Sequence, residues 1–73
     1  MTIKEVWESL TPARRSALQG LIMQDGVGAT AAWMYLTGRT RPMKLYRESI
    51  CRHVNYVTGE IHFTEDLFPE KVS

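Results

Sequence analysis

The chain has 73 residues and a mass of 8.4 kDa, a size at which we expect one hydrophobic core and one domain. Apolar residues make up 44% of the chain and charged residues 23%, which excludes the aromatic-poor, highly charged composition of disordered proteins. The formal net charge of +1 is unevenly distributed, because residues 1–10 carry −1, residues 11–57 carry +5 and residues 58–73 carry −3. A basic middle therefore lies between acidic ends.

Cysteine content and hydropathy indicate where such a chain resides. Cys51 is the single cysteine, so no internal disulfide can form and no cysteine pair is spaced for structural zinc. The first residues lack the apolar run of a secretory signal, and no run of about 18 apolar residues occurs. We therefore expect a small cytoplasmic protein with no membrane partner.

Two short helices are predicted at the start of the chain. Four apolar residues of the first segment recur at i, i+3, i+4 and i+7, as on one helix face: Ile3, Val6, Trp7 and Leu10. Thr11 and Pro12 then supply a hydroxyl cap and a proline at the first position of a second helix. Its apolar stripe consists of Ala17, Leu18, Leu21 and Ile22. Gly20 weakens that helix but need not break it, and a glycine inside a helix often marks the close approach of a neighbour.

A glycine-containing turn at residues 25–28 connects the second helix to a third. Gly26 is placed as a left-handed stop, and Gly28 can open a helix through residues 29–36 that ends at Gly38. Two helices joined by so short a turn must cross steeply, which is the helix-turn-helix geometry.

The remainder of the chain is predicted to form a fourth helix and a tail. A basic loop at residues 39–42 ends in Pro42, which introduces the helix; Tyr46, Ile50 and Val54 repeat every four residues on its core face. The tail, residues 55–73, has a turn at 58–59, a short extended segment at 60–63 and a capped helical turn at 64–69. The predicted fold class is all-α, with four to five short helices in one domain over residues 1–73.

Residues 26–42 resemble the helix-turn-helix of phage Cro and repressor proteins. In that family the turn glycine precedes an apolar residue, as Gly26 precedes Val27, and the recognition helix ends in an aromatic, a leucine, a small polar residue and a glycine, as residues 35–38 do. A basic loop closing on proline follows, here residues 39–42. Residues 58–69 are similar to the closing segment of small Cro-like proteins. The resemblance implies a lambda-repressor-like DNA-binding fold with residues 55–73 as a Cro-like tail.

The same resemblance implies a function. Such a protein is a small transcriptional regulator, a Cro-like repressor of phage or prophage, that binds duplex DNA sequence-specifically as a homodimer with its third helix in the major groove. The base-contacting residues it implies lie on that helix and its first turn: Gly28, Ala29, Thr30, Trp33 and Met34. The phosphate-contacting residues are cations of the flanking segments: Arg14, Arg15, Arg39, Arg41, Lys44 and Arg47.

Each of these residues also has a simpler interpretation. The cations can be solvated surface charges, and Trp33 can be a core residue or part of a protein-binding surface. Few of the implied base-contacting side chains can make bidentate hydrogen bonds to base edges. The alternative function is therefore a protein-protein interaction module on a helix-turn-helix scaffold that uses exposed Trp33 and Met34.

Reactive side chains are few and poorly placed for catalysis. Cys51 and His53 are two residues apart on a predicted helix and do not share a face, and His62 has no second ligand at metal spacing. Glu65 and Asp66 follow Thr64 as first-turn acids of a capped turn. We expect no enzyme activity, catalytic residue, metal, cofactor or small-molecule substrate.

Overall fold

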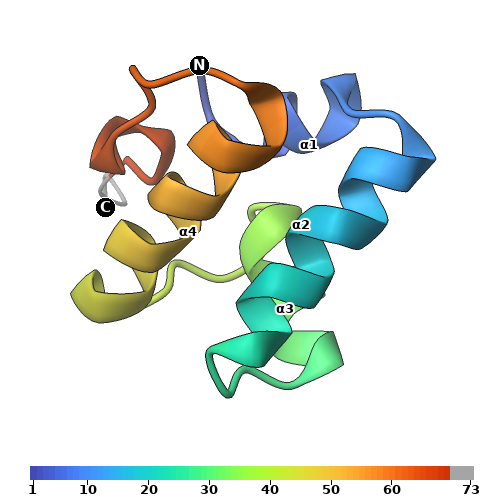
Figure 1. Ribbon diagram of the computed structural model, residues 1–73. Helices are drawn as coiled ribbons and strands as arrows, with labels where there is room; N and C mark the ends of the chain where they lie inside the picture. The colour runs from blue at the N-terminus through green and yellow to red at the C-terminus, as the bar shows by residue number, and fades with distance from the viewer. Residues whose placement is uncertain (70–73) are drawn as a thin grey trace.

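The computed structural model describes residues 1–69, and this part of the chain is all-helical, as the sequence predicts (Figure 1). Its elements in chain order are α1 (Ile3–Ser9), α2 (Pro12–Gln24), α3 (Ala29–Leu36), α4 (Lys44–Thr58) and the 3₁₀ turn η1 (Glu65–Leu67). Helix α2 packs against both α3 and α4, α1 packs on α3, and η1 packs on α4. The end of the predicted tail, residues 70–73, lies outside the described residues.

Side-chain caps start the first two helices. The Thr2 hydroxyl accepts a hydrogen bond from the Glu5 amide at 3.3 Å, and the Glu5 carboxylate accepts one from the Thr2 amide at 2.9 Å. The bond from the Thr2 amide, together with one that the Thr2 hydroxyl donates to the same carboxylate at 3.1 Å, lowers the pKa of Glu5. Thr11 caps α2 by accepting from the Arg14 amide at 3.3 Å, and Pro12 is the first helical residue, as predicted.

One hydrophobic core is shared by all five elements. Its buried apolar residues are Ile3, Val6, Leu10, Leu18, Ile22, Val27, Ala32, Leu36, Ile50, Cys51, Val54, Leu67 and Phe68. The predicted core face of α4 is confirmed, because Ile50 and Val54 are buried and Tyr46 packs against the core beside Tyr35. Burial raises the pKa of the Cys51 thiol to about 11, so this cysteine is a protonated packing residue.

The predicted glycine stops are confirmed at both ends of α3. Gly26 has a φ of 94° directly after the cap of α2, and Gly28 is the N-cap of α3. At the other end Gly38 has a φ of 77°, its amide donates to the Tyr35 carbonyl at 3.3 Å, and the Arg39 amide donates to the Met34 carbonyl at 2.9 Å. These two hydrogen bonds form a Schellman motif. The motif turns the chain sharply out of α3 and fixes the position of Arg39 relative to the helix.

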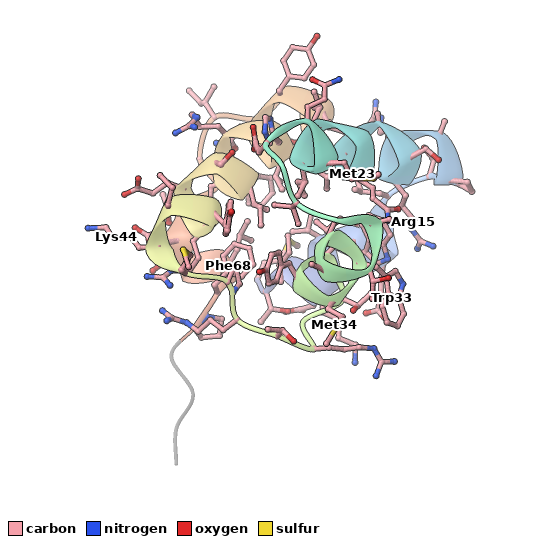
Figure 2. The ribbon with its side chains drawn as sticks, turned by 90° about the horizontal axis from the view of Figure 1, so that it is seen from below. Arg15, Met23, Trp33, Met34, Lys44 and Phe68 are labelled. Carbon is pink, nitrogen blue, oxygen red and sulfur yellow. The ribbon has the colours of Figure 1, made fainter. Side chains whose placement is uncertain are left out.

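Helices α2 and α3 cross steeply. Seen from below, α2 runs across the view while α3 is viewed almost end-on (Figure 2). The turn between them, residues 25–28, is short and holds Val27 in the core. The crossing leaves one side of α3 uncovered.

Three sequence expectations need correction. No heavy atom lies within 4 Å of a Cβ built on Gly20, so no neighbour approaches it closely. Helix α4 begins at Lys44 rather than at Pro42, because the Pro42 side chain is fully buried and the extended residue Met43 caps the helix. The helix also continues to Thr58, four residues into the predicted tail, because Val57 still packs against the core and the left-handed residue Gly59 ends it.

The segment after α4 is irregular and is held by side-chain hydrogen bonds. Within residues 1–69 no segment forms a strand, including the predicted extended segment 60–63. The Asn55 amide group donates to the Phe63 carbonyl at 3.1 Å and accepts from the Phe63 amide at 3.0 Å. Thr64 caps η1, as predicted for a short capped turn. Among the helices described, none has the length and apolarity required to span a bilayer.

Two glycine substitutions are expected to change stability in opposite directions. Gly26→Ala places a Cβ at a positive φ and should lower the free energy of unfolding by roughly 1–2 kcal/mol. Gly20→Ala lies in the open interior of α2 and should raise it by about 0.5–1 kcal/mol. Urea denaturation followed by circular dichroism measures both, and destabilisation by Gly20→Ala would contradict the open space around that residue.

Candidate nucleic-acid interface

The uncovered side of α3 contains the residues that the sequence implies for base contact. Ala32 and Leu36 are fully buried, whereas Ala29 in the first turn of the helix, Thr30 and Trp33 are exposed to solvent. The exposed fraction of Trp33 is 42%, which excludes a core position for this side chain. Gly28 is also exposed, whereas Met34 is half-buried. The structure thus brings four of these residues together on an open face, which we call the α3 face: Gly28, Ala29, Thr30 and Trp33.

Arg39 stacks on the indole ring at the end of the α3 face. Its Cζ atom lies 4.8 Å from the centroid of the Trp33 ring, within the range of a cation-π contact. The Schellman motif makes this contact possible, because it returns the chain toward the helix at Arg39. A stacked guanidinium presents its N–H donors around its edge, where a planar anion can accept them.

Arg14 and Arg15 are adjacent in sequence but have different surroundings. Arg14 is exposed in the first turn of α2. Arg15 donates from Nε to the Trp7 carbonyl at 2.9 Å and from a terminal nitrogen to the Glu8 carbonyl at 3.1 Å. Its Cζ atom also lies 5.5 Å from the centroid of the Trp7 ring. Arg15 therefore satisfies the last carbonyls of α1 and joins α1 to α2.

The cations around the start of α4 are directed largely toward the C-terminal segment. Arg47 donates from Nε to the Glu65 carboxylate at 3.0 Å and from a terminal nitrogen to the Pro42 carbonyl at 2.7 Å, and its side chain is only 13% exposed. Arg41 is exposed but donates from Nε to the Phe68 carbonyl at 3.2 Å. Both arginines anchor the segment around η1.

Lys44 is exposed, yet the structure separates it from the centre of the α3 face. Figure 2 shows Lys44 and Trp33 at opposite sides of the molecule, with Arg15 on the side of Trp33. The six implied phosphate-contacting residues thus fall into two groups. Arg15, Arg41 and Arg47 hold parts of the chain together, while Arg14, Arg39 and Lys44 extend from separate elements.

Sequence reasoning missed a polar contact that positions α3. The Gln19 amide nitrogen donates to the Ala29 carbonyl at 3.2 Å, linking α2 to the first turn of α3. The contact joins residues ten positions apart across the turn, which no local pattern in the sequence indicated.

A second missed contact joins the α2–α3 turn to α4. The Ser49 hydroxyl donates to Oδ2 of Asp25, and Nε2 of His53 lies 2.9 Å from the same oxygen. Ser49 and His53 are four residues apart and share a face of α4, which the sequence could have indicated. Their partner Asp25, 24 residues from Ser49 and 28 from His53, was not predictable from spacing. The hydrogen bond from Ser49, followed by that with His53, holds the pKa of Asp25 below its ordinary value.

This Asp-Ser-His group differs from a catalytic triad in its geometry. In a triad the imidazole uses its two nitrogens for the two partners, whereas here Nε2 of His53 faces both Asp25 and Ser49, the latter at 3.3 Å. Ser49 is also buried. Within residues 1–69, no group of three or more His, Cys, Asp or Glu side chains could hold a metal ion. The contacts support a structural role for the group.

The position of Asp25 also affects the charge of the surface. Residues 9–47 contain six arginines and lysines and a single acid, Asp25. The Asp25 carboxylate contacts Ser49 and His53 of α4 and remains ionised there, so it offsets one of the six cations of this segment. Comparison of the chain with protein-family models, curated proteins and solved structures gives no match.

The contacts of the Asp25 carboxylate with Ser49 and His53 should stabilise the fold in a pH-dependent way. Because the pKa of Asp25 is lower in the folded chain than in the unfolded chain, the stabilisation is complete above the ordinary value of 3.8 and is lost as the pH falls through the lowered value. Asp25→Asn should reduce the free energy of unfolding at neutral pH by about 1 kcal/mol, the value for a charged hydrogen bond reduced for solvent screening.

Urea denaturation at neutral and acidic pH measures this effect. The difference between wild type and Asp25→Asn should shrink below pH 3.8. Asp66→Asn makes the same chemical change at an exposed carboxylate of η1 and controls for net charge. An equal loss of stability in both variants would show that the contacts of Asp25 contribute nothing specific.

Proposed function

We propose that the chain is a small cytoplasmic transcriptional regulator, similar to phage Cro repressors, that binds duplex DNA with α3 in the major groove. The observation that supports this best is the open α3 face, which bears no acidic side chain and has Arg39 stacked at its end. Helices α2 and α3 with the turn at residues 25–28 form the helix-turn-helix of this proposal.

Small side chains at the start of α3 suit close approach to base pairs. Gly28, Ala29 and Thr30 leave the helix backbone uncovered on its exposed side, so that the first turn can enter the groove deeply. The Thr30 methyl group and the Ala29 side chain can contact thymine methyl groups, and the Thr30 hydroxyl can hydrogen-bond a base edge.

Phosphate groups on either side of the groove would be held by exposed cations. Arg14 lies at the start of α2 and Arg39 at the end of α3, and Lys44 at the start of α4 is a third contact farther along the backbone. The stack on Trp33 orders the Arg39 side chain before DNA arrives, which lowers the entropy lost on binding. A homodimer on a two-fold operator would double these contacts.

The second candidate is a protein-binding module that uses Trp33 and Met34. Exposure of Trp33 is compatible with it, but Met34 is half-buried and offers a partner less apolar surface than the sequence implies. The cations around Trp33 favour a polyanion.

DNA binding should be weak on a generic duplex and should fall steeply with salt. Fluorescence anisotropy with a labelled duplex at about 50 and about 200 mM salt gives the slope of log K against log salt. Arg39→Gln should reduce that slope by about 0.9 and weaken binding to every sequence, because one phosphate contact is lost.

Arg52→Gln is the matched control for this measurement. Arg52 is an exposed arginine of α4 outside the proposed contacts, and its substitution changes the net charge equally. Equal effects of the two substitutions would mean that only net charge matters. Absence of binding at low salt would overturn the DNA proposal and leave the protein-binding module.

A further inference from the structure

A hollow of about 400 Å³ lies between α1 and the end of α3, beside the Trp33–Arg39 stack. It is lined by Lys4, Trp7, Glu8, Thr37, Gly38 and Arg39. Arg39 therefore lines the hollow and also stacks on Trp33 of the α3 face, so that a molecule bound at one would continue into the other.

The side chains of this hollow match the parts of one nucleotide. Lys4 and Arg39 supply two cations for a phosphate, and the part of the half-buried Trp7 ring that Arg15 and the core leave accessible supplies an aromatic surface for a base. The exposed Glu8 carboxylate can accept a hydrogen bond from an exocyclic amino group, and it would repel a second phosphate. This combination favours a base with its phosphate over a bare anion.

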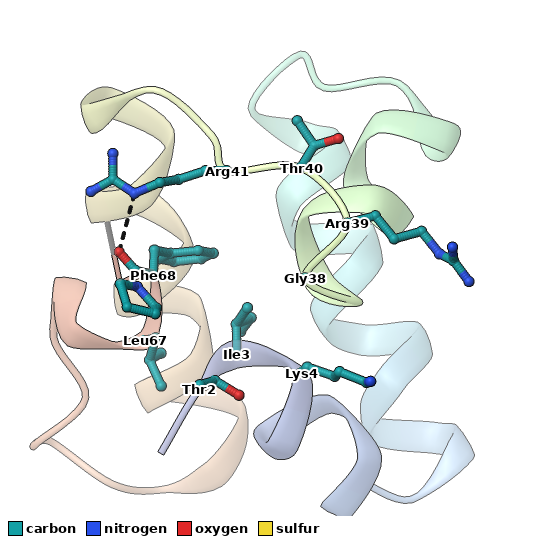
Figure 3. Close-up of a pocket in the computed structure, with 10 residues that line it drawn as sticks. Thr2, Ile3, Lys4, Gly38, Arg39, Thr40, Arg41, Leu67 and Phe68 are labelled. Carbon is teal, nitrogen blue, oxygen red and sulfur yellow. Dashed lines mark hydrogen bonds between the residues drawn. The ribbon is translucent and has the colours of Figure 1, made fainter. Parts of the chain in front are cut away.

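The neighbouring cavity is less suited to a charged ligand. That cavity, of about 310 Å³, is lined mainly by apolar groups such as Ile3, Leu67 and Phe68, and the Arg41 side chain in it is bonded to the Phe68 carbonyl. Figure 3 shows Lys4 and Arg39 pointing to the same side, away from Phe68. Both cationic side chains therefore point out of the apolar cavity, toward the side of the molecule where α3 ends.

The α3 face itself gives a reason to bind unpaired DNA. Of its residues only Thr30 has a polar side chain, so hydrogen-bonded reading of paired bases is limited. Trp33 offers an exposed aromatic surface, and aromatic side chains that meet DNA often stack where base pairs are disrupted.

We propose that the hollow between α1 and α3 accepts one unpaired nucleotide of DNA, with its phosphate between Lys4 and Arg39 and its base against Trp7. Trp33 then stacks on the base pair left exposed. This inference rests on the proposed DNA binding and adds a preference for DNA that contains an unpaired nucleotide.

The test compares two duplexes of equal sequence, one fully paired and one with a single-nucleotide bulge. Fluorescence anisotropy at low salt should show about tenfold tighter binding of the bulged duplex by the wild-type chain, the gain typical of stacking one base. Lys4→Gln should abolish this preference. Lys44→Gln removes an equal charge on the side of the molecule opposite Trp33 and should weaken binding to both duplexes while the preference remains.

The possible results separate this inference from the proposed function. Equal affinity of the wild-type chain for the two duplexes would overturn the inference and leave DNA binding intact. A preference that persists in Lys4→Gln would overturn the assignment to this hollow. Absence of binding to either duplex would overturn both proposals. Circular dichroism and urea denaturation of each variant establish that it folds.

Discussion

The packing of α2 against α4 is the contact on which the other elements depend. Leu18 and Ile22 of α2 and Ile50 and Val54 of α4 are almost completely removed from solvent, and hydrophobic burial of this kind provides most of the driving force for a small core. Apolar packing has little directional preference, so it brings the helices together without selecting a single register. The hydrogen bonds of Asp25 with Ser49 and His53 supply direction at the end of α2.

The orientation of α3 follows from that arrangement. Because Asp25 is bound to α4, the turn that follows it starts from a fixed point, and Gly26 reverses the chain in the left-handed conformation that favours glycine. Gln19 then bonds the first turn of α3, while Ala32 and Leu36 pack into the core. The exposed side of α3 is therefore determined by contacts on its opposite side, which is why substitutions on the α3 face can test function without disturbing the core.

The arginines of this chain divide between structural and exposed roles. Arg15, Arg41 and Arg47 each donate to at least one backbone carbonyl, and Arg47 also to the carboxylate of Glu65. Carbonyls at the ends of helices and in loops need such donors when no backbone amide reaches them. Net charge summed over a sequence segment consequently overstates the cationic surface that a partner can meet.

Patterns among neighbouring residues predicted much of the fold, whereas contacts between residues distant in the sequence could not be predicted from it. The cap at Thr11, the stops at Gly26 and Gly38 and the core face of α4 each depend on residues within a few positions, and all are confirmed. The role of Arg47 was not predictable, because its bond to Glu65 joins residues 18 apart that only the packing of η1 on α4 brings together.

The start of α4 and the surroundings of Gly20 show the same limit. Pro42 is suited to a first helical position, but its side chain is fully buried and the next residue, Met43, is still extended, so the helix begins two residues later at Lys44. Gly20 suggested a close neighbour that the helix packing does not supply.

For the candidate site, the sequence placed Trp33 on the correct helix but left its exposure open. Trp33 lies at the edge of the face that buries Ala32 and Leu36 and remains 42% exposed, and the Schellman motif at Gly38 brings Arg39 back to its ring. A tryptophan held in this way is ordered before any partner arrives, so in the proposed DNA complex recognition would depend on shape and stacking more than on hydrogen bonds to base edges.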